Sequence, residues 1–207
     1  MTDIYAFGKF SKARIETFSD GVFAIIVTLL VLELKVPHIE EVKSPVELIK
    51  ALISLAPKFL SWIISFLLVC VVWINHHRLL DQFKGINNGM FWANANLLMW
   101  CSFVPFPTAL IGDYPENKLA LFFFGISLSL TAFAFTIMRL YATKHQGLLN
   151  DFVDIKVFKQ GTKLSFIYGT LAYWIAASLA WINPMISFAI YFLIPVYFIF
   201  PKASKAN

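Results

Sequence analysis

Charged residues are scarce in this chain of 207 residues. Asp, Glu, Lys and Arg together make up 14% of it, whereas hydrophobic residues make up 59%. Because a typical soluble domain carries about 25% charged residues, this composition excludes a soluble enzyme, a disordered tail and a nucleic-acid-binding domain. We therefore predict a membrane protein, whose net charge of +5 reflects its topology rather than a nucleic-acid partner.

Cysteine is also scarce. Cys70 and Cys101 are the only two cysteines, and both lie inside apolar runs, which argues against a disulfide framework and against a zinc site. The sequence also lacks a Gly-rich phosphate loop and a serine or cysteine placed to pair with a histidine. We expect no enzyme activity, no metal ion and no cofactor.

Long apolar segments, in contrast, are abundant. A helix needs about 20 mostly apolar residues to cross the hydrocarbon core of a bilayer. Continuous apolar runs favour helices over a barrel, whose strands would alternate apolar and polar residues. The predicted fold class is therefore all-α, with six transmembrane helices near residues 18–36, 52–75, 91–111, 118–141, 164–182 and 184–201.

The basic residues predict the orientation. With six spans, most of the 17 Lys and Arg residues fall on one side of the membrane, and those on the other side are Lys35, Lys43, Lys50, Lys58 and Lys118. The side rich in basic residues is expected to be cytoplasmic. Both termini, with Lys9, Lys202 and Lys205, would then be cytoplasmic.

The first predicted helix differs from the others. Its uninterrupted apolar run, Gly21 to Leu32, is about 18 Å long as a helix, whereas the bilayer core is about 30 Å thick. On a helical wheel centred on Ile25, the residues Gly21, Val22, Leu29 and Leu32 form one aliphatic face with Thr28 at its edge. Periodicity alone favours ordinary helix packing for this face and leaves a pore lining as the alternative.

The residues before this run form a specific motif. Arg14-Ile15-Glu16-Thr17-Phe18-Ser19-Asp20, an R-x-x-x-F-S-D string, resembles the first-helix signature of the bacterial branch of the transmembrane protein 175 family of potassium channels. The six-span plan, the His76-His77 pair and the Pro105-Phe106-Pro107-Thr108 segment are similar to that family too, so the resemblance covers essentially the whole chain.

The resemblance implies a potassium-selective leak channel built as a single six-helix domain over residues 1–207. Because the motif occurs once, it implies a homotetramer in a bacterial plasma membrane, surrounded by lipid and conducting potassium ions. In the family the first helices line the pore, so Ile25 would form the constriction, with Leu29 and Leu32 further out and Thr28 contributing to selectivity. The absence of a T-V-G-Y-G loop and of an Arg-repeat helix excludes an ordinary voltage-gated potassium channel.

Asp20 lies at the inner membrane boundary and cannot reach Arg14 on its own helix. We expect its partner among Asn75, His76, His77 and Arg78, in a structural network that includes Arg14, Phe18, Ser19, Asp20, His76 and His77.

Three other functions stay open at this stage. They are a proton-permeable channel, a cation transporter and a non-conducting scaffold. The middle of every predicted span lacks the ionisable residues that a transporter would use, which weakens the transporter alternative.

Overall fold

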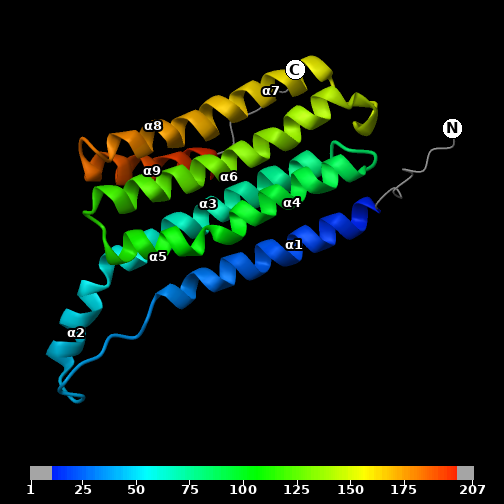
Figure 1. The fold of residues 1–207 in the computed structure, drawn as a ribbon. Helices are drawn as coiled ribbons and strands as arrows, with labels where there is room; N and C mark the ends of the chain where they lie inside the picture. Colours follow the sequence, from blue (N-terminus) through cyan, green and yellow to red (C-terminus); the bar gives the residue numbers. More distant parts are fainter. Residues whose placement is uncertain (1–10, 200–207) are drawn as a thin grey trace.

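The structure is a computed structural model that describes residues 11–199, and these residues are almost entirely helical (Figure 1). This confirms the all-α class, since the described part of the chain has only one isolated bridge, between Phe83 and Leu149. The α-helices are α1 (Lys12–Leu29), α2 (Pro45–Ser54), α3 (Ala56–Leu80), α4 (Asn88–Phe103), α5 (Pro105–Asp113), α6 (Lys118–Lys144), α7 (Ile155–Ser165), α8 (Ala172–Leu179) and α9 (Pro184–Ile199). Between them lie the 3-10 helices η1 (Leu30–Glu33) and η2 (Gln146–Leu148) and the π-helix η3 (Phe166–Leu171).

The prediction of six spanning helices is wrong. Within the described residues four helices are long and apolar enough to cross a membrane, namely Lys12–Glu33, Ala56–Leu80, Asn88–Asp113 and Lys118–Lys144. The expected spans 164–182 and 184–201 do not meet this requirement. The chain is thus a multi-pass membrane protein with fewer qualifying helices than its hydropathy suggested.

Neither of the last two predicted spans forms one long qualifying helix. The segment expected to span at 164–182 is divided, because the α-helical geometry of α7 changes to the π-helix η3 at Phe166 before α8 begins. The last helix contributes an apolar helix over Pro184–Val196, which is too short to qualify, and residues 200 and 201 of the expected span lie outside the described part of the chain.

The helices form a bundle in which α6 is central (Figure 1). It packs against α4 and α5 on one side and against α7, η3, α8 and α9 on the other. Small side chains make this close packing feasible. At Gly125 a methyl group would overlap both the Tyr191 hydroxyl and the Ala177 side chain, and Tyr191 donates a hydrogen bond to the Leu121 carbonyl across the α6–α9 interface (2.9 Å).

α1 lies at the edge of the bundle opposite α7 and α8, where it packs against α3 and α4 (Figure 1). The short helix α2 projects away from the bundle, and none of its side chains is buried. Each of these helices therefore leaves surface that the rest of the described chain does not cover.

Prolines mark two changes of direction in the chain. Pro105 begins α5 after a break at Val104, because proline cannot continue the hydrogen bonding of the preceding turn. α8 and α9 form a hairpin at Asn183 and Pro184, held by a hydrogen bond from Ser187 Oγ to the Ala176 carbonyl (2.7 Å).

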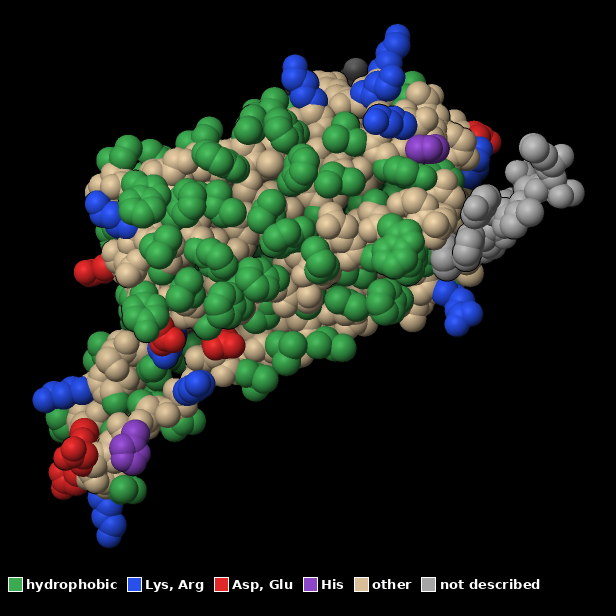
Figure 2. Space-filling model, viewed as in Figure 1, with side chains coloured by type: hydrophobic (Ala, Val, Ile, Leu, Met, Phe, Trp, Pro, Cys, Tyr) green, Lys and Arg blue, Asp and Glu red, His purple; other side chains and the backbone are tan. Residues whose placement is uncertain are grey.

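The charged side chains lie mainly at the two ends of the bundle, and hydrophobic side chains cover the surface between them (Figure 2). One end holds the loop after α3, where Lys84 contacts Asp151 (3.0 Å). The other end holds Lys118, which donates to the Trp181 carbonyl (3.0 Å). Lys9, Lys202 and Lys205, which contributed to the orientation argument, lie outside the described residues.

Candidate pore-lining site

One face of α1 is exposed along the length of the helix. Ile25 is 59% exposed, and Leu29 and Leu32 are exposed as well. Gly21 belongs to the same face, and a methyl group there would meet no atom of residues 11–199 within 4 Å. Packing within the subunit therefore does not account for this face, which is the one that the helical wheel identified.

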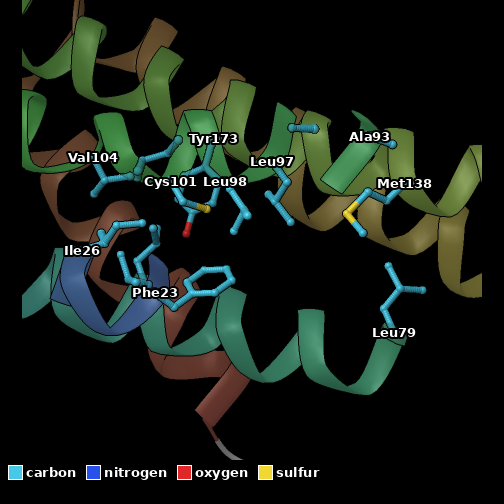
Figure 3. Packing of buried hydrophobic residues seen from close by; sticks show 14 of the residues in the cluster. Phe23, Ile26, Leu79, Ala93, Leu97, Leu98, Cys101, Val104, Met138 and Tyr173 are labelled. Atoms are coloured by element: carbon cyan, nitrogen blue, oxygen red, sulfur yellow. The ribbon is translucent and has the colours of Figure 1, made fainter. Parts of the chain in front are cut away.

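The opposite face of α1 is packed into the core. Ile26 is 2% exposed, and Phe23 and Leu30 are equally buried. Figure 3 shows Phe23 and Ile26 directed at buried side chains that include Leu98, Cys101 and Val104 of the neighbouring helix segment. Because this face anchors the helix, the direction in which Ile25 points is fixed by the fold.

Thr28 is exposed and lies one turn beyond Ile25. Its hydroxyl donates to the backbone carbonyls of Ala24 (3.1 Å) and Ile25 (2.9 Å). Since the hydroxyl proton is used within the helix, the oxygen lone pairs are left to accept a hydrogen bond or contact a cation.

Ser19 of the motif belongs to a buried polar chain that joins three helices. Asn94 of α4 donates from Nδ2 to Ser19 Oγ (3.0 Å), and its Oδ1 lies 2.7 Å from His76 Nε2 of α3. Because Oδ1 can only accept, His76 donates from Nε2. His76 Nδ1 is then a buried acceptor without a partner among the described residues.

Asn94 was not predicted to belong to the motif network. The available signal was an amide in an apolar helix. The sequence could not distinguish Asn94 from Asn96, because nothing local shows which of the two faces α1.

Asp20 has a different partner from those expected. Trp73 of α3 donates from Nε1 to Asp20 Oδ1 (2.8 Å). His77 stacks on the Trp73 ring (centroid distance 6.1 Å) and lies 3.6 Å from Asp81 Oδ2 rather than beside Asp20. The second helix does supply the partner, but one turn before His77.

Arg14 and Phe18 of the motif take part in neither the Ser19–Asn94–His76 contacts nor the Asp20–Trp73 contact. Arg14 and Phe18 are exposed, and the part of the chain that the structure describes gives Arg14 no salt bridge. No group of three or more His, Cys, Asp or Glu side chains within residues 11–199 could hold a metal ion.

Comparison with known proteins identifies the family. The sequence model described as the endosomal/lysosomal potassium channel TMEM175 matches residues 14–105, which include the R-x-x-x-F-S-D motif, His76 and Asn94. A potassium channel of Chamaesiphon minutus is 38% identical over 89% of this chain and 92% of that protein. The chain belongs to the TMEM175 family.

Other TMEM175 relatives agree. A potassium channel of a Chryseobacterium species is 34% identical over 84% of this chain and 94% of that protein. The solved structure of a TMEM175 homologue from Chamaesiphon minutus, described as a lysosomal potassium-selective channel homologue, aligns with a TM-score of 0.79 at 34% identity and covers 91% of this chain and 96% of that one.

Animal members of the TMEM175 family are longer. The human endosomal/lysosomal proton channel TMEM175 is 33% identical over 53% of this chain, but that alignment covers only 23% of the human protein. Since the TMEM175 family consists of ion channels, the expectation that this chain is not an enzyme is confirmed.

Proposed function

We propose that this protein is a potassium-selective leak channel in which α1 of each subunit lines a central pore. The exposed face of α1, with Ile25 uncovered beside fully buried Ile26, is the observation that carries the proposal. A single copy of this helix cannot enclose a path for ions, so several copies must meet along it. A homotetramer is the assembly that the family resemblance implies.

The exposure of Asp20 is evidence that water or another subunit, rather than lipid, lies beside α1. Its side chain is exposed although Trp73 donates to it. A charged side chain in hydrocarbon costs about 3 kcal/mol at the bilayer centre, and part of this cost remains at the membrane boundary where Asp20 lies. A second copy of the chain, or the water of an ion pathway, removes that cost.

The side chains on the face suggest how potassium is preferred. A narrow ring of Ile25 forces a cation to lose part of its hydration shell, a loss that costs sodium more than potassium because sodium holds its water more tightly. The Thr28 oxygens, whose protons are used within the helix, would offset part of the cost for potassium. Leu29 and Leu32 continue the apolar lining, and a further narrowing would stop conduction by dewetting.

The remaining features of the proposal concern the setting. The chain forms one channel domain, with potassium as the permeant ion, membrane lipids as neighbours and no cofactor. The membrane is a bacterial plasma membrane, in line with the bacterial relatives. The end of the bundle that carries Lys84 faces the cytoplasm, together with both termini.

Cation flux across liposome membranes tests the proposal. The purified full chain is reconstituted in potassium-loaded vesicles, and flux is followed through a proton-sensitive dye in the presence of a protonophore. A channel gives flux that does not saturate with potassium and is smaller with sodium. Saturable flux would instead identify a carrier. The absence of flux would indicate a non-conducting scaffold.

A proton-permeable channel is the second candidate, because the animal relatives are named proton channels. The same vesicles without the protonophore separate the two. Dye quenching driven by a pH gradient in the absence of potassium would identify proton permeation.

A further inference from the structure

A groove of about 520 Å³ lies between α6 and the α7–η3 segment. α7 lies on the side of the bundle away from α1 (Figure 1). If α1 faces the centre of an oligomer, this groove faces the surrounding lipid. Its composition indicates what it would bind there.

The walls of the groove are apolar. Phe133 and Leu140 of α6 and Phe166 of η3 line it and remain exposed. From residue 133 to residue 143 α6 is about 15 Å long, so the apolar strip suits an extended acyl chain rather than a small ion.

The hydroxyl groups in the groove do not call for a polar ligand. Thr136 donates to the Ala132 carbonyl (3.0 Å), Thr143 to the Arg139 carbonyl (2.9 Å) and Thr162 to the Phe158 carbonyl (2.9 Å). Each hydroxyl proton is already used, and Thr136 and Thr162 are buried, so the threonines offer a ligand no hydrogen-bond donor.

Two positive charges lie along one side of the groove. Lys159 and Lys163 line it, and their spacing of four residues places them on the same face of α7. Within residues 11–199 neither lysine has a salt bridge, and no Asp or Glu lines the groove. A single anionic group can therefore contact both ammonium groups without competition.

Arg139 builds the groove rather than contributing its charge to it. Its guanidinium donates to the Phe158 carbonyl (3.0 Å) and the Thr162 hydroxyl (3.3 Å), and it lies over the Phe158 ring at 4.5 Å. Gly161 provides the space, because a methyl group there would overlap the guanidinium. These contacts hold α7 against α6 and fix the position of the two lysines.

The groove lies at the basic end of the bundle, the level at which lipid headgroups are expected. Lys and Arg side chains gather at this end of the molecule, beside the apolar surface (Figure 2). Basic pockets between helices at the cytoplasmic side of a membrane are suited to phosphate headgroups, and each lysine near an anionic surface contributes about 1 kcal/mol. The alkyl stems of lysine can lie along apolar surface while the charges reach the phosphate.

We propose that this groove binds an anionic phospholipid. One acyl chain lies along Phe133, Leu140 and Phe166, and the phosphate contacts Lys159 and Lys163. The site would sense membrane composition at a position remote from the proposed pore, and lipid binding at it does not require the chain to conduct ions.

Native mass spectrometry of the detergent-solubilised full chain tests this site. Phosphatidylglycerol is titrated in, and the occupancy of the tightest site is measured. The K159Q/K163Q variant is expected to bind about 30-fold more weakly, since it loses two lysine contributions. The matched control K144Q/K156Q removes the same charge at the same end of the bundle from residues outside the groove, and it should bind as the original chain does.

Leu140→Trp provides a second variant that keeps both lysines and fills the apolar strip. It should weaken phosphatidylglycerol binding at least about tenfold, about 1.4 kcal/mol, without changing the circular dichroism spectrum. Phosphatidylcholine, which has the same chains and no net charge, should not reach the same occupancy.

Three outcomes would overturn the proposal. Equal losses of phosphatidylglycerol affinity in K159Q/K163Q and K144Q/K156Q would indicate general attraction by charge. Displacement of the phospholipid by an equal concentration of inorganic phosphate would assign the lysines to a free anion. Unchanged binding in both K159Q/K163Q and Leu140→Trp would place the tightest lipid elsewhere.

Discussion

At the scale of single residues, Ile25 and Ile26 show how the fold assigns opposite roles to identical neighbours. About 100° of helix rotation separates them, and it leaves Ile25 59% exposed and Ile26 2% exposed. A polar substitution at Ile26 would bury an unpaired amide and destabilise the core. At Ile25 the same substitution should leave the fold intact and act on ion flux.

Ile25→Asn is expected to raise total cation flux and to lower the potassium-to-sodium flux ratio at least about tenfold, about 1.4 kcal/mol of discrimination. The physical reason is that a smaller, polar side chain widens the constriction and replaces part of the lost hydration. Flux in liposomes with each cation in turn measures it.

Ile175→Asn is the matched control for this change. Ile175 of α8 is 60% exposed, so it has the same exposure as Ile25 on a helix away from α1. An unchanged flux ratio in Ile25→Asn, or an equal change in Ile175→Asn, would show that α1 does not form the constriction.

The second residue-scale prediction concerns Asn94. Asn94→Ala removes both hydrogen bonds that join Ser19 to His76, and it is expected to lower the free energy of unfolding by about 1 kcal/mol, within the range for hydrogen bonds between membrane helices. His76→Ala and the double variant complete a cycle that thermal unfolding of the purified protein can measure. Because the residues share one network, the double change should cost less than the sum.

Asn96→Ala is the control on the same helix. Asn96 is only partly buried, so its replacement should have a smaller effect. Additive losses at Asn94 and His76 would contradict a shared network.

At the scale of elements, the close approach of α6, α8 and α9 depends on one glycine. Gly125→Ala would bring a methyl group into the Tyr191 hydroxyl and the Ala177 side chain. We expect a loss of about 1–3 kcal/mol in the free energy of unfolding, as for other overpacked cores. The midpoint of thermal unfolding in detergent measures the loss.

Gly85→Ala is the comparison, because a methyl group at Gly85 meets nothing within 4 Å. If both variants unfolded at the same temperature, the Tyr191 contact would not limit the packing of α9.

The elements also show where hydropathy stops being informative. The apolar content of residues 164–182 predicted one long helix, but the chain there passes through the π-helix η3, where the Thr170 carbonyl accepts a hydrogen bond from Ser129 Oγ (2.9 Å). Hydropathy measures composition within a window, so it does not register a change of helix type.

At the scale of the whole molecule, orientation is testable with cysteine labels. If the basic end is cytoplasmic, labels at Glu41 and Asn117 should react with an impermeant thiol reagent added outside, and labels at Lys84 and Lys156 should not. Glu41 lies in the connection between η1 and α2, and Lys84 lies in the loop between α3 and α4.

The measurement uses whole cells, with and without permeabilisation. Reaction at Lys156 in intact cells would reverse the assignment of the basic end. Background from Cys70 and Cys101 is expected to be small, since Cys101 is buried and Cys70 is partly buried.

Whereas the exposure of one face of the first helix needed the structure, the sequence by itself determined the membrane class, the helical fold and the first four spans. These are local properties, because hydropathy and a 3.6-residue period are read from residues close together in the chain. The motif at Arg14 to Asp20 was also sufficient to indicate the family.

Only the tertiary structure decided the partners. Ser19 and Asn94 are 75 residues apart in sequence, and Asp20 and Trp73 are 53 apart, so no local pattern specifies either pair. The groove between α6 and α7 likewise depends on how Arg139 holds two helices together. Which side chain a polar group meets is determined by the packing of distant helices, and that packing follows from the bundle as a whole.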